Sequence, residues 1–181
     1  MTRTTDGQGQ GEETGRLDSA SFAGVVERYS ADVACLANRI LGWPGDVDDV
    51  VQEVFLAAYL NLKGFRGQCQ VRTWLFTITL NKCRTHLRRQ RMHLKALFGI
   101  AEQTPAPTGA GQDDEVLQQV RRALEQLPGR YREPVVLWYL QGLPADQICQ
   151  VLGIRRNTLH VRLARARQQL RGLLAGIEDE P

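Results

Sequence analysis

The stretch from Leu143 to Leu174 predicts two helices separated by a tight turn, and its sequence is LPADQICQVLGIRRNTLHVRLARARQQLRGLL. Ile148, Val151 and Leu152 give the first helix one apolar face. Gly153 permits the left-handed backbone that ends a helix. In the second helix apolar residues recur at steps of four and three, at Leu159, Leu163, Ala166, Leu170 and Leu173. The rest of that helix carries only basic charge, at Arg155, Arg156, Arg162, Arg165, Arg167 and Arg171. One buried seam and a cationic outer face fit the major groove of DNA, so the segment predicts a helix-turn-helix.

A second basic cluster, free of acids, comprises Lys82, Arg84, Arg88, Arg89, Arg91 and Lys95. The two clusters hold 12 of the 23 lysines and arginines, although the net charge is only +3. Two separated basic patches indicate a polyanion that is bound at two places. Solvated surfaces and an acidic protein partner remain the alternatives.

Cysteine usage predicts neither disulfides nor a metal site. The four cysteines, Cys35, Cys69, Cys83 and Cys149, include no CxxC pair. Cys83 and His86 have ligand spacing on a helix, but two ligands do not make a site, so we predict no metal and no cofactor. With no apolar run at the N-terminus and none long enough to span a bilayer, we expect a cytoplasmic protein without membrane contact of its own.

Helical periodicity runs through most of the chain, and no long stretch alternates with the period of two that a strand requires. Residues 22–40 predict a first helix, which the sequence GWPG ends at residues 42–45. Asp46 is expected to cap a second helix that reaches about residue 63. A third helix is expected at about residues 71–91. Helices at 116–127 and 131–140 precede the helix-turn-helix. We therefore expect an all-α fold.

Composition divides this fold into two small helical domains. Residues 1–16 predict a disordered tail, residues 96–115 a flexible acidic linker rich in proline and glycine, and residues 177–181 a short second tail. The domains are expected at 17–95 and 116–176. The apolar residues 96–100 could instead extend the third helix or dock on an inhibitor.

The second helix has two faces. Val47, Val50, Val51, Val54, Phe55, Ala58 and Leu62 fall on one side and predict core packing. The other side carries Asp49, Gln52, Glu53, Leu56 and Leu60. Leucines flanked by carboxylates have the composition of a partner-binding patch, although single surface leucines also occur without function.

The third helix carries a polar stripe at Thr77, Asn81, Arg84 and Arg88 between two apolar stripes. One apolar stripe is Phe76, Leu80, Cys83 and Leu87; the other is Val71, Trp74, Leu75 and Ile78. Asn and Thr can hydrogen-bond to bases and arginines can bind phosphates. Trp74, near the start of the helix, is either a surface on which an unstacked base packs or simply part of the core.

These residues together resemble a bacterial sigma factor of the compact, extracytoplasmic-function type within the sigma-70 family, over most of the chain. The strongest matches are DVDDVVQEVFLAAYLNLKGFRG at 46–67 and RTWLFTITLNKCRTHLRR at 72–89. The second domain adds LPGRYREPVVLWYLQGL and then GIRRNTLHVRLARAR. The resemblance implies a protein that joins core RNA polymerase and directs it to promoters.

The resemblance also implies a role for each face. The face containing Asp49, Gln52, Glu53, Leu56 and Leu60 would bind the clamp helices of the largest polymerase subunit. The third helix would read the minus-ten element as single-stranded DNA through Trp74, Thr77, Asn81, Arg84 and Arg88. The helix-turn-helix would read the minus-thirty-five duplex through Arg155, Arg156, Thr158, His160, Arg162 and Arg165, and would contact the flap of the second large subunit. An anti-sigma factor is the implied controller.

Three residues depart from the family pattern, namely Pro144 and, on the recognition helix, His160 and Val161, the last standing where a small polar residue is common. Pro144 stands where serine or threonine usually caps the first helix of the helix-turn-helix, so we expect that helix to form with a weaker cap. His160 stands where a basic residue is common, and either meets DNA or faces solvent.

A free-standing helix-turn-helix regulator is the alternative function, although it would need neither the acidic face nor the third-helix stripe. An enzyme acting on nucleic acid would need a catalytic constellation, and we identify no catalytic residues.

Overall fold

A computed structural model describes residues 21–42, 46–98 and 112–175, and in this part of the chain every regular element is helical. In chain order the elements are α1 (Phe22–Leu41), α2 (Val47–Leu60), a 3-10 turn η2 (Leu62–Gly64), α3 (Val71–Phe98), α4 (Gln112–Gln126), α5 (Gly129–Val135), a π-helical turn η3 (Val136–Leu140), α6 (Ala145–Leu152) and α7 (Arg156–Leu174). The expected all-α class is confirmed. None of the described helices is long and apolar enough to cross a membrane.

Helices α1, α2 and α3 form a bundle around one apolar core. The predicted apolar faces meet there, with Leu36 on α1, Val54 on α2 and Phe76 on α3 all fully buried. Gly42 ends α1 in the left-handed conformation, at φ 72°, and its N–H donates to the Asn38 carbonyl. This is the glycine C-cap expected where GWPG begins.

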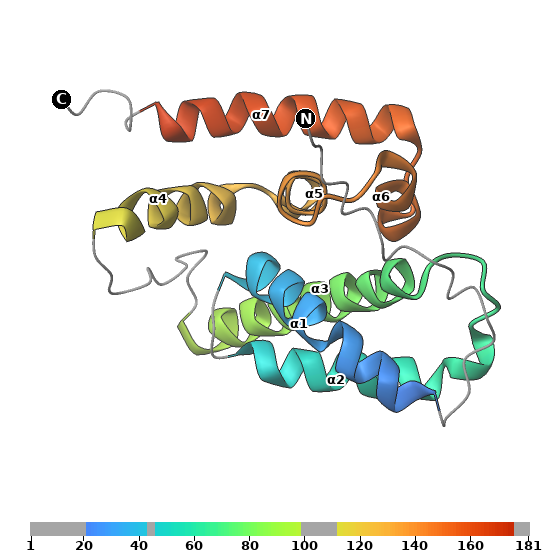
Figure 1. The fold of residues 1–181 in the computed structure, drawn as a ribbon. Helices are drawn as coiled ribbons and strands as arrows, with labels where there is room; N and C mark the ends of the chain where they lie inside the picture. The colour runs from blue at the N-terminus through green and yellow to red at the C-terminus, as the bar shows by residue number, and fades with distance from the viewer. Residues whose placement is uncertain (1–20, 43–45, 99–111, 176–181) are drawn as a thin grey trace.

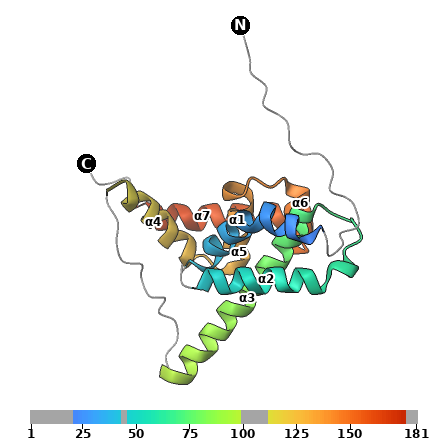
Figure 2. The same ribbon diagram turned by 60° about the horizontal axis from the view of Figure 1, so that its bottom comes forward.

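The boundaries of α3 and α4 differ from the expected ones. α3 continues to Phe98, beyond the predicted end near residue 91, so residues 96–98 extend the helix. Figure 2 shows this end of α3 projecting away from the bundle. α4 begins at Gln112, inside the stretch expected to be linker. Helix therefore occupies both ends of the predicted 96–115 linker, whereas residues 99–111 and the predicted tails at 1–16 and 177–181 lie outside the described residues.

The helix expected at 131–140 is two elements, α5 and η3. Pro134 lies inside α5 and has no N–H with which to close a helical turn. The backbone then widens, and the N–H of Gln141 donates to the carbonyl of Val136, five residues earlier, at 2.9 Å. π-Helical hydrogen bonds of this kind are rare and occur mostly as single turns adjoining α-helix.

The helix-turn-helix forms as predicted from α6 and α7. Gly153 has φ 64° and ψ 36°, the left-handed conformation that ends α6. Pro144 stands at the N-cap with no side-chain hydrogen bond, and α6 forms nonetheless. On α7 the seam residues Leu159, Leu163 and Ala166 are buried. Leu173, expected in the same seam, is 39% exposed.

The two halves of the chain pack against each other. Figure 1 shows α4, α5 and α6 as a layer between α7 on one side and the α1–α3 bundle on the other. Contacts agree with this order, because α3 touches α6, α1 touches η3, and α5 touches α7. Buried residues of both halves belong to one apolar cluster. The sequence predicted two domains on a tether, and the docking between them is a feature that periodicity did not predict.

Candidate partner and nucleic-acid interfaces

The outer face of α2 combines exposed carboxylates with exposed leucines. Asp49, Gln52 and Glu53 are exposed, as predicted. Leu56 and Leu60 are 60% and 71% exposed, among the most exposed large apolar side chains in the described residues. Burying each in a partner would release about 25 cal/mol for every Å² of apolar surface removed from water. The geometry therefore supports a protein-binding face with an apolar centre.

Tyr59 belongs to the same exposed region and was not predicted as a site residue. Tyr59 is 49% exposed, and its ring packs on Phe22 of α1 with ring centroids 5.4 Å apart. Tyrosine is enriched at protein interfaces because it offers a large rigid surface with one polar end. The helical wheel could have identified it, because Tyr59 is three residues after Leu56 and adjoins Leu60.

Glu53 is bound on its own molecule by two basic residues of α3. Lys82 Nζ donates a hydrogen bond of 3.0 Å to Glu53 Oε2, and Arg89 Nη1 lies 3.8 Å from Oε1. The hydrogen bond from Lys82 lowers the pKa of the Glu53 carboxyl. Part of the acidic edge of α2 is thus already matched by the basic helix beside it.

Near the start of α3, Trp74 packs against another aromatic side chain of the same chain. Its ring stacks on Phe65 with centroids 4.8 Å apart and is partly buried against the core. Thr77 is half-buried, and its hydroxyl donates back to the Thr73 carbonyl at 3.0 Å. These two predicted DNA contacts therefore have intramolecular partners in the described fold.

Farther along α3 the polar stripe is exposed but partly engaged. Asn81 is exposed, and its side-chain oxygen accepts a hydrogen bond from Arg84 Nη1 at 3.2 Å. Arg84 also binds Glu133 of α5, with Nε and Nη2 each 2.7 Å from a carboxylate oxygen. Arg88, one turn later, is exposed. Glu133 was not identified from the sequence, because its partner is 49 positions away.

Helix α7 presents its basic face to solvent. Arg155, Arg156, Thr158, His160 and Arg165 are exposed, and Arg162 is half-buried. Arg156 also lies 3.6 Å from Asp146 of α6. The structure thus brings the predicted residues of the recognition helix onto one element with its apolar seam turned inward.

A hollow of about 350 Å³ lies between α5 and the start of α7. Its lining residues are Arg130, Tyr131, Asn157, Thr158, Val161, Arg162 and Arg165. The Arg130 guanidinium lies 4.8 Å from the centre of the Tyr131 ring. Three guanidinium groups around one hollow favour an anionic occupant such as a phosphate. Arg130 was not predicted, because only the tertiary packing of α5 on α7 brings it to this face. Asn157 was also not predicted, although it lies on α7 next to the predicted Thr158.

Cys83 and His86 of α3 both lie against other parts of the fold. Cys83 is fully buried, and burial raises the pKa of its thiol to about 12. His86 Nε2 lies 3.0 Å from Asp46 Oδ2. Asp46 stands at the N-cap of α2 but makes no capping hydrogen bond, so the expected cap by its side chain was wrong. Among the described residues no three His, Cys, Asp or Glu side chains group closely enough to hold a metal ion.

Comparison with known proteins places these faces in a family. The sigma-70 region 2 model matches residues 25–93, and the sigma-70 region 4 model matches residues 117–170. The first match spans α1 to α3, and the second spans most of α4 to α7. The two halves seen in the structure therefore correspond to two known modules in the same order.

Individual relatives agree. The ECF RNA polymerase sigma-E factor of Escherichia coli (strain K12) is 31% identical over 171 residues, covering 88% of this chain and 89% of that protein. The structure of CnrH in complex with the cytosolic domain of CnrY matches with a TM-score of 0.67 at 30% identity, covering 90% of this chain and 92% of CnrH. The sigma factor RpoE in complex with the anti-sigma factor NepR from Bartonella quintana matches in fold, with a TM-score of 0.73 at 24% identity, over 86% of this chain and 97% of that one. The chain therefore belongs to the extracytoplasmic-function sigma factors of the sigma-70 family.

Proposed function

We propose that this chain binds core RNA polymerase through α2 and recognises promoters through α3 and α7. The observation that carries the proposal is the presence, on one chain, of an exposed apolar and acidic face and of two separate basic helices. A regulator that only binds duplex DNA has no need for the first of these, which includes Leu56 and Leu60 at 60% and 71% exposure. Polymerase and chromosome share the cytoplasm, which is where this function places the protein.

On polymerase, the partner we propose is the pair of clamp helices of the largest subunit. Asp49, Gln52 and Glu53 would meet basic groups around a centre formed by Leu56 and Leu60. Since interfaces are typically apolar at the centre and polar at the rim, this composition supports such a role. The proposed second polymerase contact is the flap of the other large subunit, reached by the α4–α7 module.

On the promoter, the two basic helices would have different tasks. α7 would enter the major groove of the minus-thirty-five duplex, with Arg155, Arg156, Thr158, His160, Arg162 and Arg165 toward DNA. Each good base contact supplies about 1–3 kcal/mol of discrimination. α3 would hold the minus-ten strand through Asn81, Arg84 and Arg88, with Thr77 and Trp74 at its edge. Extruding a base costs a few kcal/mol, so this contact would follow the binding of polymerase. The proposal assigns no catalytic step and no cofactor to the chain.

We also propose a protein that inhibits this sigma factor. CnrH, 30% identical, was solved with the cytosolic domain of CnrY. The exposed apolar face of α2 supports a similar partner here, because an inhibitor that covered Leu56, Tyr59 and Leu60 would exclude polymerase. Capture from the source organism's lysate, followed by loss of polymerase binding on adding the captured protein back, tests this part.

Run-off transcription with core polymerase and a pool of upstream fragments from the source genome tests the main proposal. We expect specific starts that disappear in Leu56→Ala/Leu60→Ala and in Arg162→Ala/Arg165→Ala. Only the first pair should also lose polymerase in a pull-down, and only the second should lose duplex DNA in a shift assay. Glu27→Gln, at an exposed position of α1, is the control. Duplex binding without any polymerase-dependent start would favour the free-standing regulator instead.

A further inference from the structure

We propose that Val161 of α7 selects thymine at one position of the minus-thirty-five element by packing on the methyl group of that base. The inference deepens the proposed function and rests on it, because α7 must lie in the major groove of this duplex for the contact to form. It adds a preference for one base, which the basic charge of the helix does not supply, since phosphate contacts carry no sequence information.

Val161 lies on the outward side of α7. Leu159 and Leu163 are buried on the inward side, at 0% and 4% exposure, whereas Val161 is 52% exposed. Because each residue turns an α-helix by about 100°, a residue two positions after Leu159 points away from the buried seam. α7 begins at Arg156, so Val161 belongs to its N-terminal part. That is the part of a recognition helix that contacts base edges.

The surroundings of Val161 are polar and cationic. Asn157 and Thr158 lie on the preceding turn, and Arg162 and Arg165 follow. Every other residue that lines the hollow beside α5 carries a hydrogen-bonding group. Single apolar side chains do occur on protein surfaces without function. Here the apolar side chain stands among groups suited to DNA, and it can contribute nothing to phosphate binding, so a base edge is the partner that its position favours.

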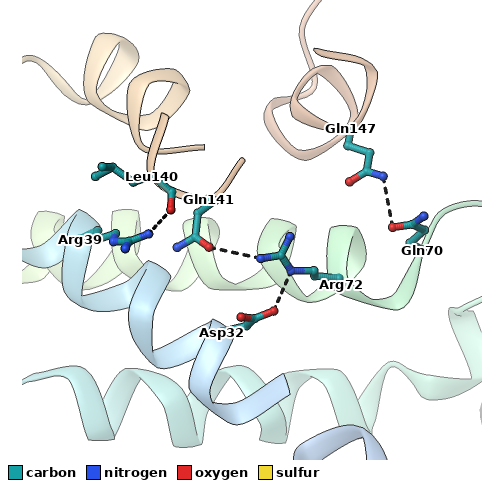
Figure 3. Close-up of polar contacts among 7 residues, drawn as sticks. All are labelled: Asp32, Arg39, Gln70, Arg72, Leu140, Gln141 and Gln147. Carbon is teal, nitrogen blue, oxygen red and sulfur yellow. Dashed lines mark hydrogen bonds and ion pairs between the residues drawn. The ribbon is translucent and has the colours of Figure 1, made fainter. Parts of the chain in front are cut away.

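The outward face of α7 remains accessible in the free chain. Figure 1 shows α7 on the opposite side of the α4–α6 layer from the α1–α3 bundle. Contacts to the bundle come from that layer and from η3: the Leu140 carbonyl of η3 accepts a hydrogen bond from Arg39, and Gln147 of α6 donates to Gln70 at 3.2 Å (Figure 3). The thymine contact can therefore be measured without polymerase.

Thymine is the base that offers valine a partner. In the major groove guanine, adenine and cytosine present hydrogen-bond donors and acceptors, whereas thymine adds a methyl group to its acceptor. Valine can neither donate nor accept a hydrogen bond, so against a polar base edge it would displace water without replacing the lost bonds. Against the methyl group it removes apolar surface of both partners from water. The gain at thymine and the cost at the other bases favour the same choice.

The neighbouring arginines would fix the depth at which α7 enters the groove. Arg130 and Arg165 line the same hollow as Val161. The hydrogen bond from Arg165 lowers the pKa of the Tyr131 hydroxyl, and the charge of Arg130 adds to this effect. Both guanidinium groups are thus grouped around one tyrosine, where they can hold a backbone phosphate. Since the thymine methyl lies on the base edge nearest its own strand's backbone, phosphate and methyl can belong to one strand.

Replacement of thymine by uracil tests the contact, because uracil lacks only the methyl group and still pairs with adenine. The full chain first selects a duplex from a pool with a random central sequence. Each thymine of that duplex is then replaced in turn, and affinities are measured by fluorescence anisotropy. We expect uracil at one position to weaken binding about fourfold, the loss that corresponds to one buried methyl group.

Two variants assign this effect to a residue. Val161→Ala removes the apolar contact and keeps the helix, because alanine is the best helix former and the position is exposed. It should bind the thymine duplex more weakly than wild type and should no longer distinguish uracil from thymine at that position. Leu173→Ala removes an exposed apolar side chain near the other end of α7 and should keep the wild-type ratio.

Three results would overturn the proposal: a wild-type chain indifferent to every uracil, a Val161→Ala variant that keeps the full ratio, or loss of the ratio in Leu173→Ala as well. The last would assign the effect to the stability of α7 rather than to a contact at Val161. An intact ratio without polymerase-dependent transcription would count against the proposed function alone. Normal transcription without a uracil effect would remove only the thymine contact.

Discussion

Lys82 of α3 donates a 3.0 Å hydrogen bond to Glu53 of α2, so the acidic edge of one candidate interface is bound to the basic helix of another. Arg89 adds a longer contact to the same carboxylate. Any protein that binds Glu53 must therefore compete with these two cations. The competition is modest, because both side chains of the hydrogen-bonded pair remain well exposed and are screened by solvent.

The pH dependence of this pair is the first prediction. Because Lys82 lowers the pKa of Glu53 in the folded chain, the pair contributes stability above the ordinary carboxyl pKa of 4.5 and loses it as pH falls through the lowered value. Lys82→Met should be less stable than wild type by up to about 0.5 kcal/mol at neutral pH and should match it in strong acid. Urea denaturation at several pH values measures the difference. A gap independent of pH would instead assign the loss to packing of the lysine stem.

A buried and an exposed leucine allow effects on folding stability and on polymerase binding to be measured separately. Leu80 on α3 is fully buried, whereas Leu60 on α2 is 71% exposed. Leu80→Ala should lower the free energy of unfolding by roughly 2–5 kcal/mol through lost burial and a cavity. Leu60→Ala should change it by less than about 0.5 kcal/mol, yet weaken polymerase binding if α2 is the interface. Urea denaturation and a pull-down on core polymerase, applied to both variants, give the comparison.

Two glycines of the second module should respond to alanine in opposite directions. Gly153 ends α6 at φ 64° with open space around its Cα, so Gly153→Ala adds only backbone strain of about 1 kcal/mol. Gly172 lies within α7 and also has open space, so Gly172→Ala should stabilise by up to about 1 kcal/mol through helix propensity. Thermal unfolding of both variants measures this. If Gly153→Ala raised the melting temperature as much as Gly172→Ala, the turn at Gly153 would not require the left-handed backbone.

Local periodicity predicted most of the fold. Phe76 and Leu80 were assigned to one apolar stripe, Gly153 to a helix end, and Leu159 with Leu163 to the seam of α7, and all are confirmed. Each rests on side chains three or four positions apart, which a helix brings together without help from the rest of the chain. The π-helical turn at Val136–Leu140 was missed, because a pattern of apolar residues three and four positions apart does not show where a hydrogen bond spans five residues instead of four.

The contacts that the sequence could not predict join residues that are far apart in the chain. Arg84 meets Glu133, 49 positions later, and Arg130 joins Arg162 only because α5 packs on α7. Both pairings are set by the docking of helices and leave no periodic trace. The Asp46 side chain pairs with His86 rather than capping α2, because α3 brings an imidazole within 3.0 Å. A single sequence contains the residues of these contacts but not their pairing.

Thiol reactivity should divide the cysteines by burial. Cys83 is fully buried and its thiol pKa is raised to about 12, so almost none is present as the reactive thiolate near pH 8. Cys35 is exposed. Brief treatment with a thiol reagent, followed by peptide mass spectrometry, should find Cys35 labelled and Cys83 protected. In denaturant all four should label; rapid labelling of Cys83 in the native chain would contradict its place in the core.

The hollow between α5 and α7 yields the last prediction, through the salt dependence of duplex binding. Arg162 and Arg165 line it, whereas Arg167 is exposed on α7 and does not. If phosphates occupy the hollow, each arginine removed should make the slope of log K against log salt shallower by about 1, because fewer counterions are released. Arg162→Ala/Arg165→Ala should therefore change the slope by about 2, and Arg167→Ala, which also removes a positive charge from the helix, should change it far less. Fluorescence anisotropy with promoter duplex at several salt concentrations measures all three. Equal slope changes for Arg165→Ala and Arg167→Ala would mean that general charge on α7, rather than this hollow, holds the DNA backbone.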